Sequence, residues 1–255
     1  MPGTCTPPVM NIQAGNANTQ VAARLIEDGL VRVSGVAGPA GLLALARSIA
    51  TIEPHRDSDD SGVTTIADVG GRVRAGFAGL SDRSLSPHTD RSGVARPPAL
   101  LLMSCGRSAT HGGDCVVVDG KTVYDELAEH HPQAAAALRA PRSAYFGGAG
   151  GHLGSVFTSV GIRMTIRLRL DDLVQFSPAA GRWLPVLREV IDRHARTFRL
   201  DPGQGYVLDN HRWLHGREAF TGRRVMYRVT GNPLPHLGIA PGFIPSRGET
   251  IPCTT

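Results

Sequence analysis

The sequence SPHTDRSG at residues 86–93, followed by PALLLMS at 98–104, gives the strongest indication of the fold. In an extended strand, residues i and i+2 point to the same face, so His88 and Asp90 can reach one metal ion. Two histidines and one carboxylate on one face of iron(II) leave three coordination positions open, as in non-haem iron oxygenases. The apolar run that follows predicts a buried strand that positions the pair. The third ligand must come from elsewhere in the chain.

The His-x-Asp pattern occurs twice, and the second copy is HRD at 55–57. A pattern this short arises by chance in a chain of this length, so the pattern alone carries little weight. The second copy lies in EPHRDSDDSG at 53–62, a polar stretch with no apolar strand after it, which predicts an exposed loop. We therefore place the metal-binding pair at His88 and Asp90.

Two histidines compete for the third ligand position, in YVLDNHRWLHGREAF at 206–220. The strand-like start of this stretch brings the chain toward the core, and His211 and His215 follow it. Residues four apart share a face of a helix, but the glycines around this stretch argue against a helix. The residues alone leave both histidines as candidates.

A group of arginines follows in TGRRVMYRVT at 221–230. A strand here would place Arg224, Met226 and Arg228 on one face. Arginines that point into a barrel need an anionic partner, because a buried unpaired charge is costly, and a dicarboxylate suits the guanidinium fork. An exposed basic strand would show the same pattern equally well.

The rest of the chain combines short strands with a few helices. Helical spacing predicts helices from Asn18 to Gly29, over 41–50, over 121–131 and over 182–196. Strands are expected at 30–36, 72–77, 98–104, 115–119, 155–158, 162–169, 205–209 and 223–230.

This order of elements predicts an α+β fold that is mainly β, with a jelly-roll core (a double-stranded β-helix, cupin-like). We expect a single domain over residues 1–255. Its N-terminal part at about 17–52 and an insert at about 121–200 are expected to be helical and to lie around the barrel.

Composition narrows the class of protein. The net charge is +5, but Lys121 is the one lysine and the arginines are spread along the chain, so nucleic acid is not the expected partner. An anionic small substrate explains this charge more simply. No apolar stretch is long enough to cross a membrane, and the N-terminus does not read as a signal peptide, so we expect a cytoplasmic protein. The four cysteines form no CxxC pair, which argues against a zinc site. Oligomeric state is not indicated.

Four motifs occur in order: HTD (88–90), GGDC (112–115), DNHRWLHGR (209–217) and RRVMYR (223–228). Together they resemble the taurine dioxygenase and clavaminate synthase-like family of Fe(II)/2-oxoglutarate oxygenases. The resemblance covers about residues 85–230. It implies a jelly-roll enzyme that uses Fe(II), with 2-oxoglutarate and O2 as co-substrates. The implied reaction is hydroxylation or another oxidation of a small metabolite, including anionic or amino-acid-derived molecules of specialised biosynthesis.

The resemblance also implies roles for residues at the iron. It places the three ligands at His88, Asp90 and His215, and so selects His215 over His211. Related halogenases have a small residue in place of the carboxylate, so an intact Asp90 favours hydroxylation over halogenation.

For the co-substrate, the resemblance assigns Arg224 to the distal carboxylate of 2-oxoglutarate. Arg228 matches a position that meets the acidic group of the substrate or helps to hold the co-substrate. Cys115 stands where the family usually has a threonine whose hydroxyl also contacts 2-oxoglutarate. A thiol is a weaker donor, so this contact is less favourable here, and Cys115 is equally well read as a plain buried residue.

Substrate contacts are less marked in the sequence. Arg74 and Arg91 lie near the first motif and could pair with an acidic group, although each also fits a surface or structural role. His152 lies in the glycine-rich FGGAGGHLG at 146–154, which reads either as a mobile lid or as an ordinary loop.

Three other classes of protein share part of this pattern. A jelly-roll isomerase or hydrolase could use the same triad on another metal, but it needs no arginine for a dicarboxylate. A non-catalytic cupin-like binding module would not need three open coordination positions. A nucleic-acid demethylase with the same iron chemistry would need aromatic stacking residues, and aromatic residues make up 5% of the chain.

Overall fold

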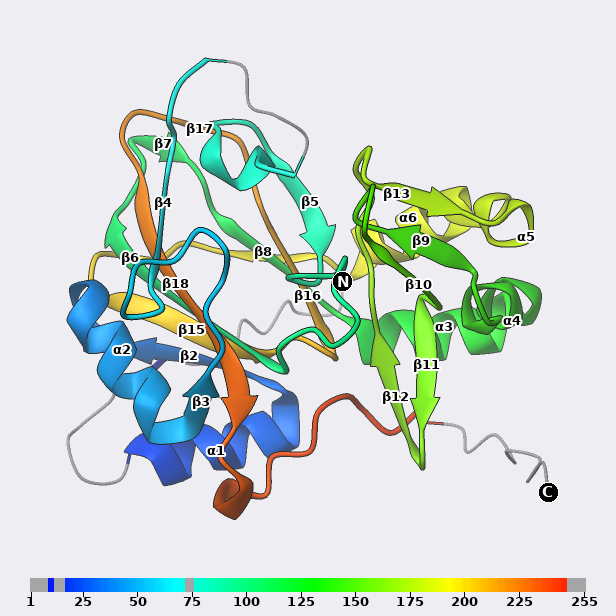
Figure 1. The fold of residues 1–255 in the computed structure, drawn as a ribbon, viewed down its shortest axis with the longest axis horizontal. Helices are drawn as coiled ribbons and strands as arrows, with labels where there is room; N and C mark the ends of the chain where they lie inside the picture. Colours follow the sequence, from blue (N-terminus) through cyan, green and yellow to red (C-terminus); the bar gives the residue numbers. More distant parts are fainter. Residues whose placement is uncertain (1–8, 12–16, 72–75, 247–255) are drawn as a thin grey trace.

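The computed structural model describes residues 9–11, 17–71 and 76–246 (Figure 1). Within these residues the larger sheet has seven strands, and its spatial order is β1 (Val9–Asn11), β2 (Leu30–Ser34), β15 (Gln204–Asp209), β6 (Leu100–Arg107), β18 (Val225–Pro233) and β3 (Ala50–Ile52), with β4 (Thr64–Ala67) also paired to β18. The smaller sheet has the order β14 (Arg196–Phe198), β8 (Cys115–Asp119), β16 (Trp213–Arg217) and β5 (Leu85–His88).

The two sheets pack together through side chains that alternate along their strands. On β6, Leu101 and Met103 point toward the smaller sheet, while Leu100 and Leu102 point the other way. Cys115 and Val117 of β8 meet the first pair from across the core. The apolar run that the sequence assigned to one buried strand therefore supplies both faces of the large sheet.

Two helices, α1 (Ala17–Asp28) and α2 (Gly38–Ile49), cover the outer face of the large sheet (Figure 1). The helix predicted from Asn18 to Gly29 is confirmed. Gly29 has φ +68° and donates its N–H to Leu25, which is how a glycine ends a helix in the left-handed region. The helix predicted at 41–50 is also present.

The insert lies on the opposite side of the barrel from α1 and α2 (Figure 1). It contains α3 (Gly120–His130), α4 (Pro132–Arg139), α5 (Pro178–Gly181) and α6 (Leu184–His194), the strands β9 (Ala144–Phe146), β10 (His152–Gly154) and β13 (Val174–Phe176), and a hairpin of β11 (Phe157–Val160) and β12 (Arg163–Ile166). These elements have their own apolar core. The insert joins the barrel at Thr89, whose N–H donates to Leu168 O at 2.8 Å, while Leu168 N–H donates to Thr89 Oγ1 at 3.1 Å.

Two further short strands, β7 (His111–Gly112) and β17 (Phe220–Thr221), pair with each other. Short 3-10 turns occur at η1 (Ala78–Leu80) and η2 (Pro235–Leu237). Among the described helices, none is long and apolar enough to cross a membrane.

Two expectations about loops and strands need correction. The predicted strand at 72–77 falls mostly on 72–75, outside the described residues, and Gly76 and Phe77 belong to no strand. The stretch 53–62 is a loop, as expected, but it is not simply exposed, because His55 keeps 15% of its side-chain surface. The reason lies in β18, whose one edge pairs with β3 at residues 231–233 and with β4 at residues 225–228, so the loop that connects β3 to β4 must run along this edge of β18.

Candidate active site

The two histidines of the site face each other across neighbouring strands. His88 ends β5 and pairs directly with His215 of β16, and their ring centroids lie 4.3 Å apart. His88 Nδ1 is 2.9 Å from Ser86 O, which fixes that ring. Burial lowers the pKa of both imidazoles, and that of His215 falls well below its ordinary value. Both rings are therefore held neutral, which is the form that binds a metal.

Asp90 lies just past the end of β5, not on the strand as the sequence suggested. The strand ends at His88 because Thr89 bonds to the insert and Asp90 N–H donates to the side chain of Asn210 at 2.7 Å. The Asp90 side chain is buried, and its Oδ1 accepts a hydrogen bond from Arg91 N at 3.0 Å. Its carboxylate is close enough to both imidazoles for their titrations to be coupled.

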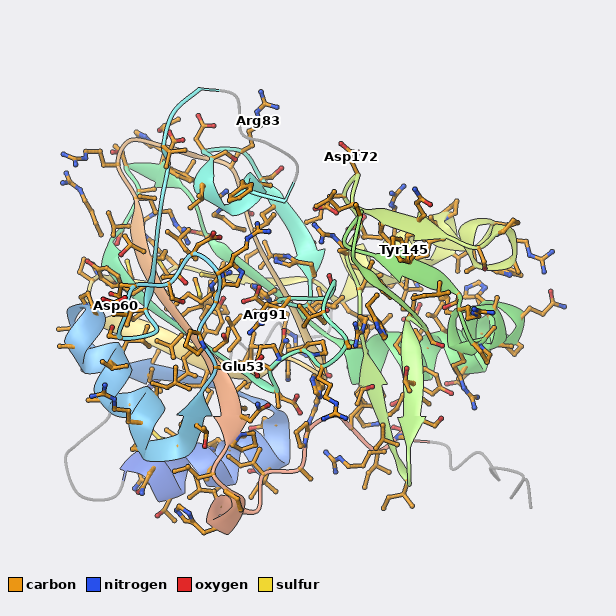
Figure 2. The ribbon with its side chains drawn as sticks, viewed as in Figure 1. Glu53, Asp60, Arg83, Arg91, Tyr145 and Asp172 are labelled. Carbon is orange, nitrogen blue, oxygen red and sulfur yellow. The ribbon has the colours of Figure 1, made fainter. Side chains whose placement is uncertain are left out.

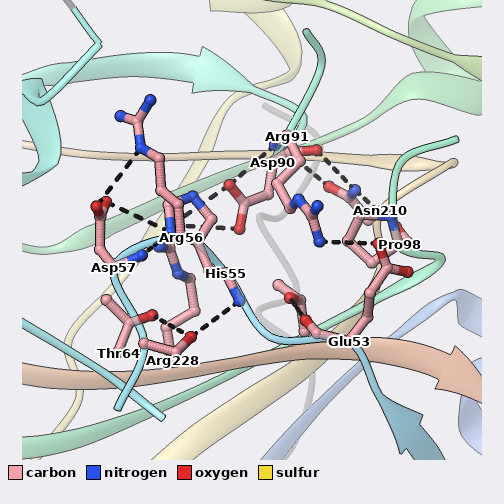
Figure 3. Close-up of polar contacts among 12 residues, drawn as sticks. Glu53, His55, Arg56, Asp57, Thr64, Asp90, Arg91, Pro98, Asn210 and Arg228 are labelled. Carbon is pink, nitrogen blue, oxygen red and sulfur yellow. Dashed lines mark hydrogen bonds and ion pairs between the residues drawn. The ribbon is translucent and has the colours of Figure 1, made fainter. Parts of the chain in front are cut away.

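The charge state of Asp90 follows from its neighbours. Burial alone would raise the pKa of the Asp90 carboxyl, but the positive charge of Arg228 holds it below its ordinary value. Arg228 Nη1 lies 3.3 Å from both carboxylate oxygens (Figure 3). The side chain is therefore an ionised, acceptor-only group at neutral pH.

A metal ion would suit atoms that the protein leaves without partners. Asp90 Oδ2 and His215 Nδ1 are buried and have no hydrogen-bond partner. Such atoms are unfavourable unless a ligand or water satisfies them. Among the described residues, however, no three histidine, cysteine, aspartate or glutamate side chains are already arranged as ligands around one point. The donor types, two imidazoles and one carboxylate, nevertheless fit iron(II).

A second group of buried residues surrounds Arg224. This arginine is buried, at 8% exposed, and within the described part of the chain it has no ion-pair partner. An exposed basic strand is therefore wrong for Arg224. Gly113 keeps space for it, since a Cβ there would lie 3.1 Å from Arg224 Cδ. A buried guanidinium without a carboxylate is the arrangement expected of an anion site.

Cys115 contacts Arg224 through its thiol. Burial raises the pKa of that thiol to about 11, although the charge of Arg224 opposes the rise. The thiol is therefore neutral at physiological pH. The two side chains line a narrow cavity that also includes Cys105, Ser108, Ala109, Gly112, Gly113, Asp114, Arg199, Leu200 and Met226.

The residues expected to contact substrate lie in different places. Arg91 has φ +53° and donates through Nη1 to Glu53 Oε1 at 2.8 Å, and Figure 2 shows the two side chains together near the centre of the molecule. His152 lies in β10 of the insert, beside Arg167. Arg74 lies outside the described residues. His211, the rival of His215, has Nε2 3.2 Å from Pro97 O.

Sequence reasoning missed three residues at the site. His55 lies beside Asp90 and Arg228 (Figure 3), and its pKa is lowered by burial and by the charge of Arg228. Tyr206 is buried in β15 within electrostatic reach of Arg224, and burial raises the pKa of its hydroxyl. Asn210 bonds to the backbone of Asp90. The second His-x-Asp copy was a signal for His55, but it was assigned to an exposed loop.

Comparison with solved structures establishes the fold. An asparagine oxygenase in complex with Fe(II), 2S,3S-3-hydroxyasparagine and succinate aligns with a TM-score of 0.68 and 18% identity, over 84% of this chain and 78% of that one. The non-haem iron oxygenase OrfP, in complex with Fe and alpha-ketoglutaric acid, aligns with a TM-score of 0.63 and 15% identity, over 89% of this chain and 94% of that one. The predicted mainly-β, α+β fold with a jelly-roll core is confirmed.

Sequence comparison adds curated relatives and a family. The gamma-butyrobetaine dioxygenases of Homo sapiens and Pongo abelii are each 26% identical over 172 residues, which cover 58% of this chain and 43% of each relative. The chain thus spans less than half the length of these relatives. Residues 7–230 match the family described as taurine catabolism dioxygenase TauD, TfdA family. This match confirms the resemblance stated from the sequence: the chain belongs to the TauD/TfdA family.

Proposed function

We propose that this protein is an Fe(II)- and 2-oxoglutarate-dependent dioxygenase that hydroxylates a small amino-acid-like metabolite. The observation that carries the proposal is the pairing of two sites in one barrel. One is the group of His88, His215 and Asp90, and the other is the buried, unpaired guanidinium of Arg224. Metal-dependent isomerases, hydrolases and binding modules of this fold have no need of the second site.

In this proposal His88, Asp90 and His215 hold the iron. The neutral imidazoles donate lone pairs, and the ionised carboxylate offsets part of the metal's charge. When bound, the iron supplies O2 activation coupled to the decarboxylation of 2-oxoglutarate. The chain supplies the rest, because Thr89 and Asn210 fix the strand end that carries Asp90, and the fold buries the side chains of Asp90 and His215.

The co-substrate would lie between the iron and Arg224. Arg224 would bind its distal carboxylate through the guanidinium fork, and the neutral thiol of Cys115 lies beside that carboxylate. Arg228, which lies against Asp90, is placed to meet an acidic group of the substrate or the inner carboxylate of the co-substrate. The relatives named for gamma-butyrobetaine and asparagine support a substrate with a carboxylate and a charged nitrogen. We propose that the enzyme acts on this small molecule in the cytoplasm.

Anaerobic titration tests this function directly. Wild-type protein with Fe(II) and 2-oxoglutarate is expected to show the visible charge-transfer absorption of the chelate, and to form succinate when O2 is admitted. His215→Ala is expected to lose iron binding. Arg224→Ala is expected to keep iron and lose about 100-fold or more in 2-oxoglutarate affinity, since a buried charge-assisted pair disappears.

Arg223→Ala is the matched control, because Arg223 is the exposed neighbour of Arg224 on the same segment. We expect it to behave as wild type in both titrations. A wild-type protein that gives neither the absorption nor succinate would refute the proposed function. Equal 2-oxoglutarate affinity in Arg224→Ala and Arg223→Ala would refute the role of Arg224.

A further inference from the structure

Asn210 occupies an unusual position at the turn that joins β15 to β16. Its side chain is buried, at 1% exposed, and it makes three hydrogen bonds to the backbone of other segments. Oδ1 accepts from Asp90 N at 2.7 Å, while Nδ2 donates to Asp90 O at 3.1 Å and to Pro98 O at 2.9 Å (Figure 3). Its own N–H donates to Ala99 O at 2.8 Å.

These bonds replace a missing strand partner. Asp90 lies beyond the end of β5, so no neighbouring strand pairs with its buried N–H and C=O. The carboxamide of Asn210 pairs with both groups at once, in the way that a residue of an antiparallel strand would. The orientation of the Asp90 backbone therefore depends on one side chain and not on a β-ladder.

The turn that carries Asn210 is itself firmly held. The carboxylate of Asp209 accepts from His211 N at 2.8 Å and from Gly242 N at 2.7 Å, and Arg212 N–H donates to Asp209 O at 3.0 Å. The same turn leads into β16, which carries His215. Asn210 thus connects the segment of one proposed ligand to the segment of another.

We propose that Asn210 is a positioning residue that sets the Asp90 carboxylate relative to His88 and His215 for metal binding. The proposal rests on the proposed function, since it assumes that these three side chains hold the iron. With the Asp90 backbone fixed by Asn210, Oδ1 accepts from Arg91 N, while Oδ2 is ion-paired with Arg228 at 3.3 Å but accepts no hydrogen bond, which leaves it lone pairs for a metal. Removal of such a supporting contact typically weakens metal affinity by about 10- to 100-fold.

The test measures Fe(II) affinity by anaerobic titration of wild type, Asn210→Ala, His215→Ala and Asn232→Ala. Asn232 is the matched control, because its side chain also accepts a backbone N–H of this region, from Ala99 at 3.1 Å, without touching Asp90. Asn210→Ala is expected to lose about 10-fold or more in Fe(II) affinity, with the absorption of its 2-oxoglutarate chelate shifted. Asn232→Ala is expected to stay within about 3-fold of wild type on the same scale.

Each outcome decides between a positioning role and a general structural role. Wild-type affinity in Asn210→Ala, or equal losses in both asparagine variants, overturns the proposal. If Asn210→Ala does not fold, Asn210→Ser replaces it, with circular dichroism as the check. An unfolded Asn210→Ser assigns the residue to global stability and also overturns the proposal. If wild type and His215→Ala bind Fe(II) equally, the proposed function itself fails, which is a distinct result.

Discussion

Replacing Cys115 with threonine should strengthen the binding of 2-oxoglutarate. Cys115 lies on β8 against Arg224, and its thiol is neutral because burial raises its pKa to about 11. A neutral thiol is a weak hydrogen-bond donor, whereas a hydroxyl is a good one. Threonine also suits a β-strand, and its size is close to that of cysteine. Cys115→Thr therefore adds a donor beside the proposed carboxylate position with little disturbance of the packing.

The expected gain follows from the energy of one hydrogen bond. A typical intramolecular bond contributes about 0.5–1.5 kcal/mol net, and one to a charged group lies at the upper end or above. This corresponds to a 2-oxoglutarate dissociation constant lower by about 3- to 10-fold. The assay is an anaerobic titration of the Fe(II)-loaded protein with 2-oxoglutarate, followed by the charge-transfer absorption.

The control separates the hydroxyl from the shape of the side chain. Cys115→Val has the branched shape of threonine without a donor, so it should bind 2-oxoglutarate no better than wild type. A folded Cys115→Thr variant whose dissociation constant is unchanged or higher would refute the contact between residue 115 and the co-substrate. Equal gains in the threonine and valine variants would assign the effect to packing.

Three further predictions concern stability. Leu102→Ala removes a fully buried side chain between β6 and the helices that cover it, so urea unfolding should show a free energy of unfolding lower by about 2–5 kcal/mol. A decrease under about 1 kcal/mol would contradict this packing. Burial raises the pKa of Asp209 from 3.8 to about 7, so between about pH 4 and 7 the folded chain keeps a proton that the unfolded chain has lost. The free energy of unfolding should therefore fall as pH rises through that window, by up to about 1.4 kcal/mol per pH unit. The Asp209→Asn variant should flatten this pH dependence in thermal unfolding curves. Thr89→Val leaves Leu168 N–H without its side-chain acceptor and should cost about 1–3 kcal/mol by chemical denaturation, whereas a neutral result would show that this bond does not hold the insert in place.

The sequence predicted those helices and strands that are determined by the pattern of their own residues. The run at 98–104 is a strand because its alternate residues face two apolar surfaces, and the helix before Gly29 ends where a left-handed residue is needed. Short strands such as β9 and β13 were not predicted, because a three-residue strand depends on its partner and not on its own pattern.

The candidate site was predicted in part for a similar reason. His88 was expected on an extended segment and His215 after the strand at 205–209, and the pairing of β5 with β16 brings the two together in register. Asp90 was expected on the same strand as His88, but the chain leaves the ladder at Thr89, and nothing in the local sequence indicates that Asn210 replaces the missing partner. His55 reaches the site because β18 has two partners along one edge, which is a property of the sheet that no single segment reveals.

The neutral thiol of Cys115 has a consequence for oxidative damage. An enzyme that activates O2 exposes its own pocket to peroxide and related oxidants, and cysteine reacts with these as the thiolate. With a pKa of about 11, only about one molecule in ten thousand carries the thiolate at pH 7. The same burial that keeps the Cys115 thiol protonated therefore slows its oxidation to the sulfenic acid, and it lets a cysteine persist beside the proposed iron site.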